Sequence, residues 1–363
     1  YIDGKGTAFG AALQYGFNII DDVPQKIVAN MKGAQLAEVL QLLGHPALAE
    51  GKIDIEINMP EIGEDTANGY GHMVLNEAYF DRALVKELYG YDLPEKSYVH
   101  STMDAALEGQ HVKLAGEVQS NLFSLQIKEA LADLVSGRLR AAYGLDVKEM
   151  RILTENKLAG PFKADGNVEK KEGTVFVTGT SRSLGGELHF SVEKRAKVTF
   201  DRLSMEKLLV LLKQPDYAKG ELSGTVLLDD MKGESGSYEV RVDKGSIKAK
   251  GLEALSRYSI PRNNQFSLQS KGRIAGQKLI ADAVIRSTLA DVTLSEAQYD
   301  LEAKKLDTTY DILIHNVNTL IPDASPSKVT AVSAKGKLRL SDTLSISGVT
   351  KGLGKRVEFS YDG

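Results

Sequence analysis

The stretch HVKLAGEV at residues 111–118 decides the fold class, because apolar and polar side chains alternate along it. In an extended chain Val112, Leu114 and Val118 fall on one side, while the charged residues fall on the other. A period of two is typical of a β-strand with one face in water. The pattern therefore predicts a strand whose apolar face must be covered by something else.

The same alternation returns later in the chain, in the stretch KLIADAVI at residues 278–285. Here Leu279, Ala281, Ala283 and Ile285 take the places of Val112, Leu114, Gly116 and Val118. The following strands agree as well, since Leu125 and Ile127 correspond to Val292 and Leu294. The match indicates an internal duplication.

A repeated helix precedes these strands. Two stretches share one apolar stripe at helical spacing, with a separation of about 169 residues: Leu36, Val39, Leu40 and Leu43 in the first, and Met205, Leu208, Leu209 and Leu212 in the second. They predict helices at 34–44 and 204–213, the second beginning at Ser204 as N-cap. A further short helix is expected at 80–89, with a counterpart at 251–258.

The repeat divides the chain into three parts: the end of a preceding repeat at 1–32, repeat one at 33–200 and repeat two at 201–363. Since the pattern starts and stops within a repeat, we expect the parent protein to continue in both directions. Short strands joined by polar turns favour antiparallel neighbours. The predicted fold is mainly β, a long curved antiparallel sheet resembling a half-pipe, with one amphipathic helix per repeat. The alternative is a pair of β-sandwich-like domains.

Composition excludes several classes of function. The chain has 45 Lys and Arg against 49 Asp and Glu, so its formal charge of −4 offers no basic field for nucleic acid. It contains no Cys, which removes thiol catalysis and Cys-ligated zinc. No run of about 18 apolar residues occurs in it.

Motifs for catalysis or metal binding are weak. The six His residues show no spacing that would place two metal ligands on one helix face. Paired acids at Asp21-Asp22 and Asp229-Asp230 are interpreted as charged turns, and Gly4-Lys5-Gly6 as a hairpin turn rather than a phosphate loop. We therefore expect no enzyme activity, no metal and no cofactor.

What remains is the apolar face itself, which is either a closed core or an open groove for acyl chains. Each buried methylene of a lipid tail would contribute about 0.8 kcal/mol. The candidate groove residues are Val112, Leu114, Val118, Phe123, Leu125, Ile127, Leu188, Phe190, Val192, Leu279, Ile285, Val292, Leu294, Val357 and Phe359.

One family resembles this chain. Residues 208–225, in which a leucine-rich helix is followed by Gly220-Glu221-Leu222-Ser223-Gly224, lead to a glycine turn at 231–233. This sequence motif and the glycine-rich stretches 158–166 and 185–188 resemble those of AsmA-like and TamB-like envelope proteins. The resemblance extends over about two thirds of the chain. The first copy departs from the pattern, with Lys52-Ile53-Asp54 in place of Glu221-Leu222-Ser223.

The resemblance implies a large protein of the Gram-negative envelope, tethered to the inner membrane by a helix outside this chain. It implies a periplasmic β-groove that carries phospholipid between the inner and outer membranes and meets other envelope proteins at either end. The competing hypothesis is an assembly factor for outer-membrane proteins whose exposed sheet edges pair with client strands.

Overall fold

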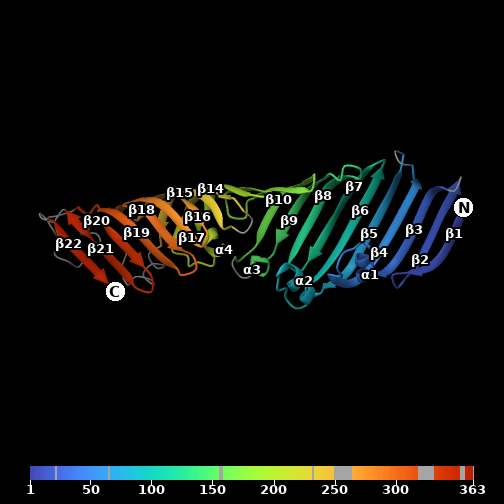
Figure 1. The fold of residues 1–363 in the computed structure, drawn as a ribbon, viewed down its shortest axis with the longest axis horizontal. Helices are drawn as coiled ribbons and strands as arrows, with labels where there is room; N and C mark the ends of the chain where they lie inside the picture. The colour runs from blue at the N-terminus through green and yellow to red at the C-terminus, as the bar shows by residue number, and fades with distance from the viewer. Residues whose placement is uncertain are drawn as a thin grey trace. The chain divides into compact units, whose positions relative to one another are not determined.

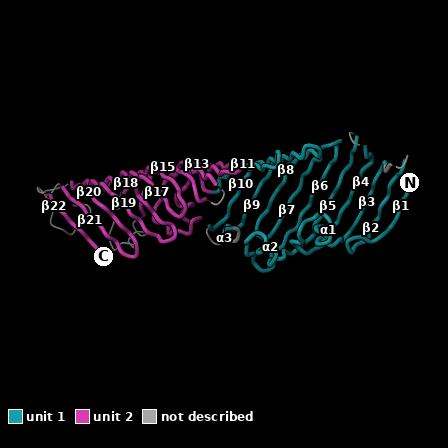
Figure 2. The backbone as a smooth tube through the Cα atoms, viewed as in Figure 1, with its two compact units in different colours: residues 1–183 teal, residues 184–363 magenta. Residues whose placement is uncertain are grey.

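The computed structural model describes residues 1–20, 23–63, 66–154, 158–230, 233–248, 264–317, 331–351 and 356–362. These residues form β-strands joined by tight turns and a few short helices, so the chain is mainly β (Figure 1). The chain divides into two compact units, Tyr1–Ser183 and Leu184–Gly363 (Figure 2). The predicted counterpart helix at 251–258 and the pair Asp21-Asp22 lie outside the described residues.

Unit 1 is an antiparallel meander in which each strand pairs with the next along the chain. Its strands are β1 (Ile2–Ala8), β2 (Ala11–Ile20), β3 (Val23–Gln35), β4 (Ala49–Glu61), β5 (Asn68–Phe80), β6 (Tyr98–Glu108), β7 (His111–Ser120), β8 (Phe123–Asp133), β9 (Leu139–Val147), β10 (Phe162–Lys171) and β11 (Thr174–Ser181).

Among the described residues of unit 1, three helical connections interrupt this meander: α1 (Leu36–Leu42), α2 (Arg82–Tyr89) and the single turn α3 (Met150–Leu153). Each joins an odd-numbered strand to the next even-numbered one, so all three lie on the same side of the sheet, where these strands end (Figure 1). The predicted helices at 34–44 and 80–89 are confirmed. Gly44 and Gly90 end them with φ of 74° and 78°, a left-handed conformation that glycine adopts at no steric cost.

Unit 2 repeats the arrangement with a second meander. Its strands are β12 (Glu187–Val192), β13 (Ala196–Ser204), β14 (Ala218–Leu228), β15 (Ser235–Ile247), β16 (Gln265–Ala275), β17 (Lys278–Ser287), β18 (Ala290–Asp300), β19 (Lys305–Ile314), β20 (Val332–Leu340), β21 (Leu344–Lys351) and β22 (Val357–Asp362). Helix α4 (Met205–Leu211) joins β13 to β14, and Ser204 Oγ accepts a hydrogen bond from the Lys207 N–H, as its predicted capping role requires.

The fold class is thus confirmed as long antiparallel β-sheet. In each unit all the described strands belong to one sheet layer, so the β-sandwich alternative is not found. One local interpretation was wrong: Gly4-Lys5-Gly6 lies within β1, not in a turn. Gly4 stands in the strand because the Tyr15 ring of β2 occupies the space where its Cβ would be.

Bulges recur at matching places in both units. β3 bulges at Gly33 and β13 at Arg202, both with positive φ, and each bulge N–H donates to a side chain on the next strand. The acceptors are Asp54 Oδ1 at 2.7 Å and Ser223 Oγ at 2.9 Å. Gly33 and Arg202 are separated along the chain by the same interval as the two helices. Asp54 and Ser223 are separated by that interval too. The strand registers around Ile53 and Leu222 also agree, although the sequence differs there.

Three clusters of buried apolar side chains lie beside the helices. Ala34, Ile53 and Leu75 pack beneath α1, and Leu203, Leu222 and Val242 pack beneath α4. A smaller cluster of Val85, Leu93 and Leu122 holds α2 to the sheet edge. α1, α2 and α4 therefore each cover the apolar face over a few strands, near the ends of those strands.

Candidate functional site

One face of unit 1 is apolar across all its strands. Directly paired residues lie on the same face of a sheet, so the registers trace ladders from strand to strand. One ladder contains glycines, methionines, aliphatic residues and a single tyrosine: Gly6, Leu13, Met31, Ile55, Met73, Met103, Gly116, Ile127, Tyr143, Gly166 and Gly179. It crosses the unit from β1 to β11 without a charged residue.

Unit 2 carries a matching ladder from β12 to β22: Leu188, Phe200, Gly224, Val240, Ser270, Ala283, Leu294, Tyr310, Gly336, Gly348 and Phe359. Apart from Tyr310, the ladder has one hydroxyl group, on Ser270. Ser270 Oγ donates to the Asp282 carbonyl at 3.1 Å and lies 3.2 Å from Tyr238 Oη. The polar group is thus satisfied within the sheet.

These apolar faces are covered only in part. Away from the helices the ladder side chains are half-buried, as Leu114, Ile127, Ile285 and Leu294 illustrate, while the residues between them on the opposite face are exposed. Eleven strands at about 4.8 Å spacing extend roughly 50 Å. In unit 1 the ladder from Leu13 to Met73 packs against the cluster beneath α1, so the part that does not begins at Met103. An apolar surface left uncovered in this way is a candidate binding surface.

All the candidate groove residues predicted from the sequence lie on these two faces. In unit 1, Val112, Leu114, Val118, Phe123, Leu125 and Ile127 share one face of β7 and β8. In unit 2 the ladders connect Leu188, Phe190, Val192, Leu279, Ile285, Val292, Leu294, Val357 and Phe359. Three of them, Val118, Phe123 and Leu188, also pack against the helix-side clusters and so contribute to the closed cores.

The sequence reasoning missed much of the same faces. In unit 1 the ladder continues through Met31, Ile55 and Met73, and in unit 2 through Phe200 and Val240. The alternation along β4, with Ile53, Ile55 and Ile57, was a signal that could have found the first group. The tyrosines Tyr143 and Tyr310 carried no such signal.

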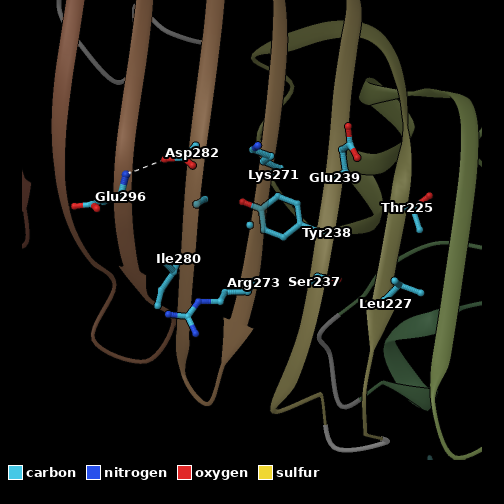
Figure 3. Close-up of a pocket in the computed structure, with 12 residues that line it drawn as sticks. Thr225, Leu227, Ser237, Tyr238, Glu239, Lys271, Arg273, Ile280, Asp282 and Glu296 are labelled. Atoms are coloured by element: carbon cyan, nitrogen blue, oxygen red, sulfur yellow. Dashed lines mark hydrogen bonds between the residues drawn. The ribbon is translucent and has the colours of Figure 1, made fainter.

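The opposite face is polar and hollowed in unit 2, where an open depression of about 500 Å³ lies over β14 to β18. Thr225, Glu239, Lys271 and Asp282 are consecutive cross-strand partners at its centre (Figure 3). Asp282 accepts a hydrogen bond from the Glu296 N–H at 3.0 Å, which satisfies a bulge in β18. Charges of both signs line this depression, so it favours no one class of ion.

Other candidate chemistry resolves into turns and surface pairs. Asp230 accepts hydrogen bonds from the Glu234 and Ser235 N–H groups, which makes the Asp229-Asp230 pair a turn cap. His111 lies 3.5 Å from Asp133 on the solvent side. Among the described residues, no group of three or more His, Cys, Asp or Glu is arranged to hold a metal ion.

Comparison with known proteins leaves the family open. No family model, no curated protein and no solved structure matches this chain. Within the described part of the chain, no helix has the length and hydropathy needed to cross a membrane.

Proposed function

We propose that this chain provides an apolar groove for the acyl chains of phospholipid, as a periplasmic segment of an AsmA-like envelope protein. The observation that supports the proposal is the pair of uncharged ladders, whose side chains are half-buried away from the helices. A lipid tail lying along the ladder would remove this surface from water at about 25 cal/mol per Å². The head group would stay in water, and no catalytic residue is required.

The tandem repeat predicted from the sequence fits the same proposal. If the two units descend from one duplicated sequence, the duplication lengthens the apolar strip and keeps its chemistry, since Val112 and Leu279 are each the second residue of their strands, β7 and β17. Sliding of a tail along such a strip needs no specific polar contact. Envelope proteins at either end would deliver and receive the lipid.

Native mass spectrometry of the chain purified in mild detergent, with lipid extraction from the same sample, tests the proposal. We expect co-purified phospholipid, and we expect Leu114→Lys and Leu279→Lys to lose it while circular dichroism still reports β-sheet. Ala115→Lys and Val284→Lys are matched controls, because they place the same charge in the same strands on the polar face.

The competing functions give different results. A lipid-free chain that unfolds in one cooperative transition would reject the groove and favour the assembly factor with pairing sheet edges. If Leu279→Lys and Val284→Lys lost lipid equally, the apolar face would not be where the lipid lies.

A further inference from the structure

Two tyrosines lie across the apolar faces in the same way. In unit 1 the Tyr143 hydroxyl donates to the Thr178 carbonyl at 3.2 Å, and in unit 2 the Tyr310 hydroxyl donates to the Ser347 carbonyl at 3.4 Å. Each bond runs from one strand to the second strand beyond it, from β9 to β11 and from β19 to β21. Each ring therefore spans the strand between.

Glycines make room for both rings. Tyr143 pairs with Gly166, which pairs with Gly179, and Tyr310 pairs with Gly336, which pairs with Gly348. A Cβ added at Gly166 would lie 2.7 Å from the Tyr143 hydroxyl oxygen, and one at Gly348 would lie 2.6 Å from that of Tyr310. Aromatic side chains that cover glycines on neighbouring strands are a known way to protect a bare backbone.

The surroundings of the phenols agree with a ring held down on the sheet. Burial raises the pKa of Tyr143 above its ordinary value, with a further contribution from Asp165, and burial also raises the pKa of Tyr310. Both side chains share a ladder with aliphatic residues, Ile127 before Tyr143 and Leu294 before Tyr310. In each unit the next two strands contribute no side chain to that ladder.

We infer that Tyr143 and Tyr310 determine which acyl chains the groove accepts, because each ring, fixed flat over two glycines, lowers the groove floor there. This inference rests on the proposed function. At these two places the ladder has the height of one aromatic ring, whereas the strand before each tyrosine contributes a standing aliphatic side chain, Ile127 or Leu294. The lowered floor has room for a methyl branch or a kink in the tail, and a ring released from its hydrogen bond would rise into that space.

The test compares straight and branched tails on the full chain. Dipalmitoyl and diphytanoyl phosphatidylethanolamine are offered together in equal amounts, and native mass spectrometry gives the ratio bound. The variants are Tyr143→Phe, Tyr310→Phe and the double variant. A hydrogen bond of ordinary net strength is worth a factor of about five, so each Phe variant should lower the branched-to-straight ratio by up to about fivefold.

Tyr70→Phe is the matched control, because Tyr70 lies in the same unit as Tyr143 and donates to Glu56 on the polar face. It should leave the ratio unchanged. If the Phe variants lower Tm but keep the wild-type ratio, the tyrosines are structural only and the inference is overturned. A wild-type chain that holds neither lipid overturns the groove and this inference together, whereas lipid bound at one ratio by all variants overturns the inference alone.

Discussion

A single ladder in unit 2 shows two fates for the same apolar pattern. It begins with Leu203, Leu222 and Val242 beneath α4, where their exposed fractions are 2%, 9% and 0%, and continues through Ile285 and Val292, which are half-buried. The residue types hardly change along the way. What changes is the helix, which covers the first strands and leaves the later ones open. Coverage by the helix, not hydrophobicity, separates the buried part of this apolar face from its half-buried part.

The largest expected effect comes from placing a charge at the covered end. Val242→Lys buries an ammonium group among Leu203, Leu222 and Leu208 without a partner, and should cost on the order of 4 kcal/mol or more in the free energy of unfolding. Ile285→Lys, on the same ladder at its open part, should cost far less because the ammonium can reach water. Thermal unfolding followed by circular dichroism measures both. Equal losses of stability would show that the ladder is closed along its whole length.

Much of this architecture is readable in the sequence, because each signal is local. Alternation along residues 111–118 places Val112, Leu114 and Val118 of β7 on one face, and Ser204 marks the start of α4. The pairing of strands then follows from the short turns. The helix positions also follow, since their stripes repeat.

What the sequence does not contain are the contacts between distant strands. The Tyr143 hydroxyl meets a carbonyl 35 residues away, and Tyr310 one 37 residues away, through glycines that in sequence suggest turns or bulges. Arg202 has a positive φ, and because it is not a glycine the sequence does not predict this conformation. Whether Ile285 is buried or partly exposed depends on how far α4 covers the sheet, and the spacing of apolar residues along the sequence does not contain that information.

A second prediction compares the two bulges, at Gly33 in β3 and at Arg202 in β13, which precede α1 and α4. Asp54→Ala removes the charged acceptor of the Gly33 N–H, which should destabilise unit 1 by about 2 kcal/mol. Ser223→Ala removes the neutral acceptor of the Arg202 N–H and should cost about 1 kcal/mol. Chemical denaturation gives both values, and Asp54→Asn should recover part of the first. A neutral effect of both variants would mean that water replaces these acceptors.

The third prediction compares the starts of the two covering helices. Ser204 caps α4 through its hydroxyl, while Gln35 at the same place before α1 makes no side-chain cap. Ser204→Ala should therefore cost about 1 kcal/mol, and Gln35→Ser should stabilise α1 by a smaller amount. Urea midpoints of the two variants measure the difference. If Gln35→Ser changed nothing, the entry into α1 would be held by the Gln35 N–H bond to the Phe9 carbonyl instead.

The smallest expected effect is a pH dependence of stability that comes from Glu149 and not from the apolar face of unit 1. Hydrogen bonds from the Gly160 and Arg151 N–H groups lower the pKa of Glu149, the residue that caps α3, below its ordinary value of 4.5. A carboxyl group whose pKa is lowered by folding stabilises the folded state above its unfolded pKa, and this contribution is lost as the pH falls through the folded pKa. The thermal stability of the wild type should therefore fall more steeply between pH 5 and about pH 3 than that of Glu149→Gln.

Lipid loading should stay constant from pH 7 to about pH 5, because the ladders contain no carboxylate or imidazole. Loss of lipid within that range would place a titrating group in contact with the bound tail, where the ladders have none.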